Sequence, residues 1–246
     1  MIRLEGVPEF VEAPFVLPTD SDPHERHGNI DLYLPEGEGP WPAAVFITGG
    51  PIPAELEWNR PRDWPMYRGY GGLLSANGLV AAPVQLPLHS YDDFPRAADA
   101  LAAAVDVVRA DPRVDGDRMC LWFFCGGSPL ISDWLRNPPQ WVRCIGATYP
   151  VLGSRPGKEL PPRFLPAEAL SVRTARPPIV LTRVGLEDPV VASTVAEFVT
   201  AAEKYDVALE IIDVPNGRHG FDFLDYTEES REAVYKALEM IRNALK

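Results

Sequence analysis

The sequence predicts an α/β fold in which a mostly parallel sheet is covered by helices on both faces. Short apolar runs typical of buried parallel strands alternate with amphipathic segments along the chain. Several of these runs also lead directly into loops with glycines and reactive side chains, as parallel strands often do at their carboxyl ends. The length of 246 residues and the hydrophobic content of 46% predict one domain spanning residues 1–246.

The expected elements follow one another in a regular order. Strands are expected at 30–34, 43–47, 79–84, 118–124, 142–149, 178–184 and 207–214. Helices are expected at 67–77, 92–110, 126–136, 190–205 and 227–245. The run 43–47 is continuously apolar, which is typical of a central strand covered on both faces. The interval 152–176 is rich in Pro, Arg and Gly, so we expect a loop excursion over the carboxyl edge of the sheet or a small cap over the active site.

Charge and composition exclude some classes of partner. The formal net charge is −12, and the chain lacks the clustered Lys and Arg that bind nucleic acid. We find neither a secretory signal pattern at residues 1–14 nor an apolar run of transmembrane length, so we expect a cytoplasmic protein without a membrane partner. The expected partner is a small molecule, compact and partly apolar. Nothing in the sequence indicates an oligomeric state.

The strand 118–124 is followed by a cysteine and two glycines, Cys125, Gly126 and Gly127. This order is typical of a nucleophile elbow, in which a strained strand-to-helix turn lifts a reactive side chain above the sheet and nearby small residues prevent clashes. Phe123 stands where the usual pattern has a small residue. The other two cysteines, Cys120 and Cys144, lie inside apolar strand patterns and are expected to be buried core thiols, since three cysteines do not make a disulfide framework.

Two further loops supply partners for the thiol. The strand 178–184 leads into Glu187 and Asp188, and the strand 207–214 leads into the segment that contains His219. The chain order nucleophile, acid, histidine, each at the end of a successive strand, is the order of an α/β-hydrolase triad. Adjacent acids in a loop are often only solvated, and the residues alone do not decide between Glu187 and Asp188.

These motifs resemble those of the α/β-hydrolases of the dienelactone hydrolase type, over roughly residues 42–245. The matching segments are Val114-Asp115-Gly116-Asp117-Arg118, Leu121-Trp122-Phe123-Phe124-Cys125-Gly126-Gly127, Gly185-Leu186-Glu187-Asp188-Pro189 and Gly217-Arg218-His219-Gly220-Phe221. The resemblance implies that Cys125 is the nucleophile, Asp188 the orienting acid and His219 the base. Phe123 departs from the family pattern, which usually has Gly or another small residue there.

An alternative register of the elbow assigns the nucleophile's position to Phe124 and predicts a catalytically dead protein. The resemblance favours Cys125, because the family's nucleophile lies seven residues after the basic residue that opens the strand, here Arg118. A free thiol has a pKa of about 8.5. We expect the start of the following helix and His219 to lower the pKa of Cys125.

An attacked carbonyl needs hydrogen-bond donors for its developing negative charge. The first expected donor is the backbone N–H of Gly126, directly after the nucleophile. The second is expected from the loop 48–51, where Pro51 has no N–H and Gly50 is the better candidate. No spacing resembles a metal site or a phosphate-binding loop, so no cofactor and no metal are expected.

Other polar and aromatic residues are expected to have lesser roles. His24 and His27 are expected at the surface, whereas His89 is a candidate for the mouth of the site. Arg183 and Arg218 are candidates for binding a substrate carboxylate, with a surface role as the alternative. Four aromatic residues are expected near the carboxyl edge of the sheet, some of them as pocket wall: Trp58, Trp64, Tyr67 and Tyr70.

The sequence thus predicts a cysteine hydrolase that opens an ester, lactone or thioester of a small molecule through an acyl-enzyme on Cys125. One alternative is a non-hydrolytic enzyme on the same scaffold, such as an isomerase, epimerase or cyclase. Phe123 motivates that alternative, since its ring at the elbow either displaces the thiol or fills the place of the attacking water. We expect instead that this ring forms part of the pocket wall. A second alternative is a binding protein without turnover.

Overall fold

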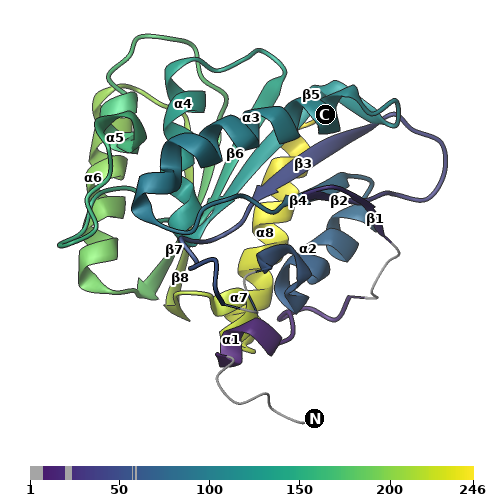
Figure 1. Cartoon of the computed structure of the whole chain (residues 1–246), viewed down its shortest axis with the longest axis horizontal. Coiled ribbons are helices and arrows are strands. Elements are labelled where there is room, and N and C mark those ends of the chain that lie inside the picture. The colour runs from purple at the N-terminus through teal and green to yellow at the C-terminus, as the bar shows by residue number, and fades with distance from the viewer. Residues whose placement is uncertain (1–7, 20–23, 57, 59) are drawn as a thin grey trace.

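A computed structural model of the chain describes residues 8–19, 24–56, 58 and 60–246, which form an eight-stranded sheet flanked by helices (Figure 1). The strands are β1 (His24–His27), β2 (Ile30–Tyr33), β3 (Trp41–Ile47), β4 (Val80–Val84), β5 (Val114–Phe124), β6 (Val142–Thr148), β7 (Ile179–Leu186) and β8 (Leu209–Arg218). Their order across the sheet is β1-β2-β4-β3-β5-β6-β7-β8. The six strands from β4 to β8 in this order are parallel, and β1 and β2 are antiparallel to their neighbours.

The five helical segments that the sequence predicts are present, and three short helices, α1, α5 and α7, were not expected. The α-helices are α1 (Glu9–Glu12), α2 (Pro65–Ser75), α3 (Phe94–Ala110), α4 (Ile131–Arg136), α5 (Pro166–Ala169), α6 (Pro189–Lys204), α7 (Phe221–Leu224) and α8 (Glu228–Ala244). Short 3₁₀ helices occur at η1 (Pro61–Asp63), η2 (Tyr91–Asp93), η3 (Cys125–Leu130) and η4 (Pro162–Phe164). The expected helix 126–136 is therefore a 3₁₀ turn that continues into α4.

The edge strand β1 was not expected from the sequence. Its residues are polar and mostly exposed, so the apolar signal that marks the other strands is missing. It pairs with β2 through a hairpin in which His27 lies opposite Ile30, and Gly28 adopts the positive φ of 58° that this tight turn requires. β1 is the outermost strand of the sheet and pairs with β2 alone.

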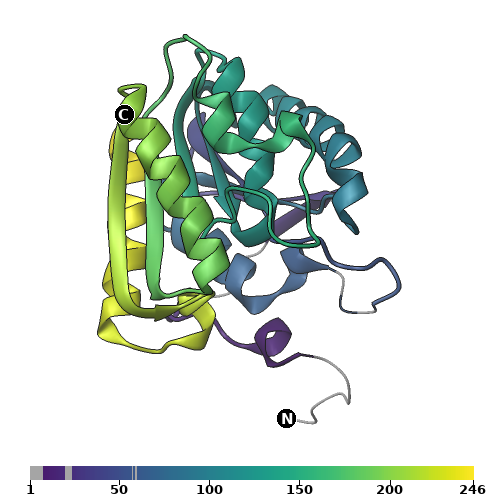
Figure 2. The same ribbon diagram turned by 90° about the vertical axis from the view of Figure 1, so that its left-hand side faces the viewer.

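The central strands bury both of their faces. Along β5, Leu121 and Phe123 point into the core beneath α3, α4 and α6, while Trp122 and Phe124 point into the core beneath α2 and α8. Figure 2 shows the sheet between α8 on one side and α6 with α3 on the other. This two-sided burial explains why the sequence of these strands is continuously apolar rather than alternating.

The interval 152–176 packs against the helices of one face of the sheet, and its first residues contact the N-terminal half of α6 and the turn η2 before α3, through Leu152 with Thr194 and Arg155 with Tyr91. It contributes Leu160 and Phe164 to the core under α3, and its helix α5 contacts α4 and α6. The segment is therefore a further layer of packing on this side of the sheet.

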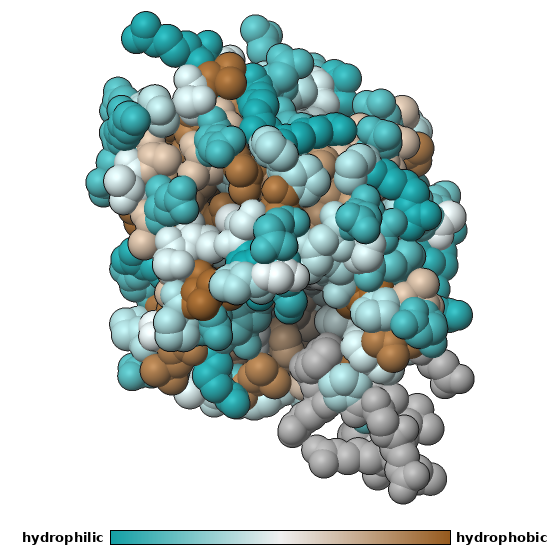
Figure 3. Space-filling model, turned by 60° about the vertical axis from the view of Figure 1, so that its left-hand side comes forward, coloured by the Kyte–Doolittle hydropathy of each residue, from teal (hydrophilic) through white to brown (hydrophobic). Residues whose placement is uncertain are grey.

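The surface is predominantly hydrophilic on the face drawn in Figure 3, where hydrophobic residues occur in small separate groups. Over the described ranges, no helix has both the length and the apolar composition needed to cross a membrane.

Candidate active site

Cys125 lies at a strained turn directly after β5. Its φ of 49° is in the left-handed region, which a residue with a side chain rarely adopts and which is typical of nucleophile elbows. The turn requires the two glycines that follow. A Cβ on Gly126 would lie 1.7 Å from the carbonyl oxygen of Gly50, and a Cβ on Gly127 would lie 2.3 Å from that of Thr48. Phe124 ends the strand with its side chain fully buried, so Cys125 occupies the elbow position.

The Cys125 thiol and His219 are in direct contact. The Sγ atom of Cys125 lies 2.9 Å from Nε2 of His219, and Nδ1 of the same ring lies 2.7 Å from Oε2 of Glu187. Each residue directly follows a parallel strand: Cys125 follows β5, Glu187 follows β7 and His219 follows β8. The three side chains form a continuous hydrogen-bonded row of thiol, imidazole and carboxylate.

The acid beside His219 is Glu187, and the expected contact of Asp188 with His219 is absent. The register of β7 and β8 places Leu186 opposite Arg218, so the next residue of each strand, Glu187 and His219, are also neighbours. The Asp188 carboxylate turns the other way and caps α6, where it accepts hydrogen bonds from the backbone N–H groups of Val190 at 2.9 Å and Val191 at 3.3 Å.

The sequence does contain a signal for this outcome. Asp188 precedes Pro189, and Asp at the N-cap with Pro at the first helical position is a common helix start. Reading the pair as a cap leaves Glu187 as the acid available to the histidine.

The neighbouring charges shift the pKa values of Cys125 and His219 in opposite directions. Burial by itself raises the pKa of the Cys125 thiol, but the charge and hydrogen bond of His219 and the N–H of Gly126 outweigh it, so the pKa is lowered. Burial lowers the pKa of His219, but Cys125 and Glu187 outweigh it and raise the pKa to about 10. Both shifts favour a thiolate paired with an imidazolium.

A pocket of about 300 Å³ opens above the thiol. Its described lining is mostly apolar and comes from the loop after β3, from α2, from the ends of β5, β6 and β8, and from α7. The lining residues are Gly49, Gly50, Pro51, Ile52, Trp64, Met66, Tyr67, Cys125, Tyr149, His219, Phe223 and Leu224. Among these described residues His219 is the only one with a basic side chain, and no residue comes from 152–176, so that segment does not form the expected cap.

Two of the four aromatic residues expected at the sheet edge line the pocket, Trp64 and Tyr67. Trp58 lies behind Trp64, with ring centroids 6.3 Å apart. Tyr70 is buried beneath the pocket, where its hydroxyl donates a hydrogen bond to Asp222.

Phe123 does not form part of the pocket wall, contrary to expectation. Its ring is fully buried on the α3 side of the sheet, whereas the pocket residues from α2 lie on the other side. The alternation of side chains along β5 directs Phe123 away from the pocket, so the ring neither displaces the thiol nor fills the place of a water.

Both glycines expected to stabilise an oxyanion lie at the thiol. Gly50 lines the pocket, and the backbone N–H of Gly126 donates toward the Cys125 sulfur. The neighbouring Gly49 has its N–H engaged, since it donates to the hydroxyl oxygen of Tyr67 at 2.9 Å.

Sequence reasoning missed a second buried carboxyl close to the histidine. Asp222 is fully buried and accepts hydrogen bonds from the hydroxyls of Tyr70 at 2.8 Å and Tyr149 at 3.1 Å. Burial raises the pKa of Asp222 to about 7, although both hydrogen bonds lower it. The Tyr149 ring in turn packs on His219, with centroids 4.9 Å apart. The signal available in the sequence was an acid within the otherwise apolar run 221–224.

The remaining candidates lie outside the pocket lining. His89 contacts the carbonyl oxygen of Ile52 through Nδ1 at 3.0 Å and does not line the mouth itself. Arg183 pairs with Asp213 at 2.6 Å, and Arg218 pairs with Asp225, so both have surface roles.

The other histidines and cysteines have the environments that the sequence predicts. His27 is half exposed and His24 is partly exposed against Tyr33. Cys120 and Cys144 are fully buried free thiols in neighbouring strands. In the part of the chain that the structure describes, no three His, Cys, Asp or Glu side chains converge as metal ligands would.

Several solved structures resemble the chain at low sequence identity. Thermogutta terrifontis esterase 2 phosphoramylated by tabun aligns with a TM-score of 0.68 and 17% identity, over 98% of this chain and 96% of that one. A bacterial heroin esterase aligns with a TM-score of 0.71 and 18% identity, over 88% and 79% of the two chains. Pyrococcus horikoshii acylaminoacyl peptidase aligns with a TM-score of 0.71 and 14% identity, over 94% of this chain and 43% of that one.

No protein-family model and no curated protein sequence matches the chain. The structural likeness shows that the chain has the α/β-hydrolase fold, as the sequence predicted. Membership of the dienelactone hydrolase type remains a prediction.

Proposed function

We propose that this protein is a hydrolase that cleaves an ester, lactone or thioester of a small molecule through an acyl-enzyme on Cys125. The observation that carries the proposal is the row formed by the Cys125 sulfur, the His219 ring and the Glu187 carboxylate at the base of the pocket, with contacts of 2.9 and 2.7 Å. The solved structures with the same fold support it, since they include enzymes named as esterases and a peptidase.

In the proposed reaction the Cys125 thiolate attacks the carbonyl carbon of the substrate and forms a tetrahedral oxyanion. The N–H groups of Gly126 and Gly50 are proposed to stabilise that oxyanion. His219 as imidazolium gives its proton to the leaving oxygen or sulfur, and the carbon–leaving-group bond breaks to leave an acyl thioester. The neutral His219 then takes a proton from water, which attacks the thioester and releases the acid. Glu187 holds the imidazole tautomer and stabilises its cation.

We propose an uncharged substrate with a compact, partly apolar acyl group. The pocket volume of about 300 Å³ fits a small molecule, and Ile52, Met66 and Phe223 offer apolar contacts. The two arginines that the sequence offered as carboxylate partners are already paired with Asp213 and Asp225. A carboxylate on the substrate would lose its hydration in this pocket without gaining a lysine or arginine partner from the described lining.

The test is to trap the acyl-enzyme. The wild type is mixed with nitrophenyl esters of increasing acyl length and with matched thioesters, and the intact protein is measured by mass spectrometry during turnover. We expect an acyl adduct on Cys125, which Cys125→Ala abolishes and Cys144→Ala, a control for loss of a buried thiol, retains. Turnover that persists in Cys125→Ala would refute the proposed nucleophile. Neither an adduct nor turnover with any of these substrates would refute the proposed hydrolysis.

A further inference from the structure

Tyr67 presents an unused hydrogen-bond donor beside the reacting thiol. Its side chain comes from the first turn of α2, is almost fully buried and lines the pocket. The hydroxyl oxygen accepts the hydrogen bond of the Gly49 N–H at 2.9 Å. A phenol hydroxyl both accepts and donates, so this contact leaves its own hydrogen available. Among the described residues we find no acceptor for that hydrogen.

The hydroxyl is also held close to the elbow that carries the thiol, through its hydrogen bond with Gly49. Gly49, its backbone partner, is so close to the elbow that a Cβ there would lie 3.2 Å from Cβ and 3.6 Å from Sγ of Cys125. Burial raises the pKa of Tyr67 well above its usual value, and the charge of Cys125 raises it further. Tyr67 therefore stays protonated over the working pH range and cannot act as a base.

We propose that the Tyr67 hydroxyl is a catalytic residue that donates a hydrogen bond to the oxyanion formed when Cys125 attacks its substrate. This inference rests on the proposed function and adds a side-chain donor to the backbone N–H groups of Gly126 and Gly50. The Gly49 N–H fixes the hydroxyl by donating to it. A bond to a negatively charged oxygen is stronger than one to the ground-state carbonyl, so the donor acts mainly in the transition state.

The other tyrosine hydroxyl at the pocket is not equivalent. Tyr149 donates to the buried carboxylate of Asp222 at 3.1 Å, so its hydrogen is engaged. Of the two tyrosine hydroxyls in the described lining, that of Tyr67 is therefore the one that can donate a hydrogen bond to a substrate oxygen.

The experiment compares Tyr67→Phe with Tyr33→Phe, which removes a buried hydroxyl outside the pocket lining. Acylation by nitrophenyl esters should slow by about 10²-fold in Tyr67→Phe, the usual loss for one oxyanion donor, and the loss should fall on kcat more than on KM. Alkylation of Cys125 by iodoacetamide forms no oxyanion, so its rate and pH profile should stay unchanged. Tyr33→Phe should match the wild type in both reactions.

An aldehyde inhibitor tests the donor without requiring turnover, because it adds to the thiol to form a hemithioacetal oxygen at the same place. Tyr67→Phe should weaken its binding in parallel with acylation. If that variant folds poorly, a ring-fluorinated tyrosine at this position keeps the acceptor for Gly49 and strengthens the donor, so acylation should stay the same or become faster.

Wild-type rates of acylation and aldehyde binding in Tyr67→Phe would overturn the assignment while leaving the proposed hydrolysis intact. If Tyr67→Phe lowered the rates of alkylation and acylation equally, the assignment would also be overturned, because Tyr67 would then act on the thiol. Failure of the wild type to bind the aldehyde at Cys125 overturns both proposals, whereas aldehyde binding without any ester turnover overturns the hydrolysis alone.

Discussion

At the scale of single residues, two adjacent acids have separate roles. Glu187 contacts His219 at 2.7 Å, while Asp188 caps α6. We expect Glu187→Gln to lower ester hydrolysis by about 10³-fold or more, because the imidazolium loses its stabilising charge and its tautomer is no longer fixed. Asp188→Asn should stay close to wild type in both activity and stability, since Asn caps helices about as well as Asp.

Steady-state kinetics on one ester checks this pair, with a thermal melt of each variant to confirm folding. Equal and small losses from the two substitutions would show that the acid lies elsewhere. A larger loss from Asp188→Asn would restore the role that the family resemblance implied for it.

The second residue-scale prediction concerns the pH dependence of the thiol. The pKa of Cys125 is lowered and that of His219 is raised to about 10, so the ion pair exists from the lowered thiol value up to about pH 10. Wild-type alkylation by iodoacetamide should therefore stay fast as the pH falls through 8.5. In His219→Ala the burial of the thiol is no longer offset by His219, so its pKa should lie at or above the ordinary value of about 8.5, leaving at most roughly 1% thiolate at about pH 6.5.

The measurement is the alkylation rate of Cys125 from about pH 5 to about pH 10, followed by mass spectrometry. Superimposable pH profiles for the wild type and His219→Ala would contradict an activated thiol. Loss of wild-type alkylation on lowering the pH from about 9 to 7 would contradict it as well.

At the scale of elements, β5 buries side chains on both faces of the sheet. Phe123 is fully buried beneath α3, so Phe123→Ala should leave a cavity and lower the free energy of unfolding by about 3 to 5 kcal/mol. The preference for acyl-chain length should not change, because the ring does not line the pocket. Phe223→Ala is the contrasting variant, since Phe223 is only partly buried and lines the pocket.

Chemical denaturation and a panel of esters of increasing acyl length distinguish the two variants. Phe223→Ala should shift the acyl preference toward longer chains with a smaller loss of stability. A broadened substrate range in Phe123→Ala with unchanged stability would contradict the burial of its ring.

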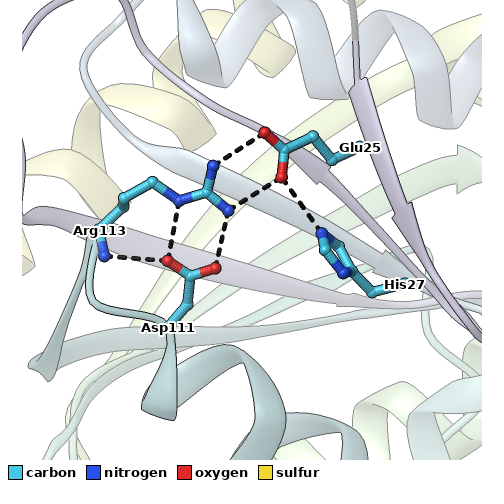
Figure 4. Close-up of polar contacts among 4 residues, drawn as sticks. All are labelled: Glu25, His27, Asp111 and Arg113. Carbon is cyan, nitrogen blue, oxygen red and sulfur yellow. Dashed lines mark hydrogen bonds and ion pairs between the residues drawn. The ribbon is translucent and has the colours of Figure 1, made fainter.

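At the scale of the whole molecule, an ion network joins the edge of the sheet to the loop before β5. Figure 4 shows Arg113 between two carboxylates: it contacts Glu25 at 2.8 and 2.9 Å and Asp111 at 2.8 and 2.9 Å. His27 lies 3.2 Å from Glu25. Arg113 thereby connects β1, which the sequence did not predict, to the segment that follows α3.

We expect Arg113→Ala to lower the free energy of unfolding modestly, by about 1 kcal/mol at most, because the groups are partly exposed and solvent screens them. Hydrogen bonding to Arg113, with a smaller contribution from His27, lowers the pKa of Glu25 to about 2, and Arg113 also lowers that of Asp111. Carboxylates with lowered pKa values stabilise the fold above their unfolded value of about 4. That stabilisation is lost as the pH falls through the folded values.

Urea denaturation at several pH values and two salt concentrations checks this prediction. The difference between the wild type and Arg113→Ala should be constant near neutral pH, shrink below about pH 4, and decrease in high salt. Arg231→Ala, which removes an exposed pair with Glu228 within α8, is the matched control and should stay near wild type. A difference that grows in acid would contradict the assigned shifts.

The sequence by itself determined the order of the strands β2 to β8 and of the longer helices, the position of Cys125 at the elbow and the approach of His219. These features depend on local patterns: apolar runs mark buried strands, and the ends of parallel strands meet at one edge. Only the tertiary structure decided which acid reaches His219, because that depends on the register of β7 against β8. It also decided that the helix α5 within residues 152–176 packs against α4 and α6, and that Tyr67 and Tyr149 line the same pocket as the thiol. Such neighbours come from distant parts of the chain, and local periodicity reports burial without identifying the residues that bury one another.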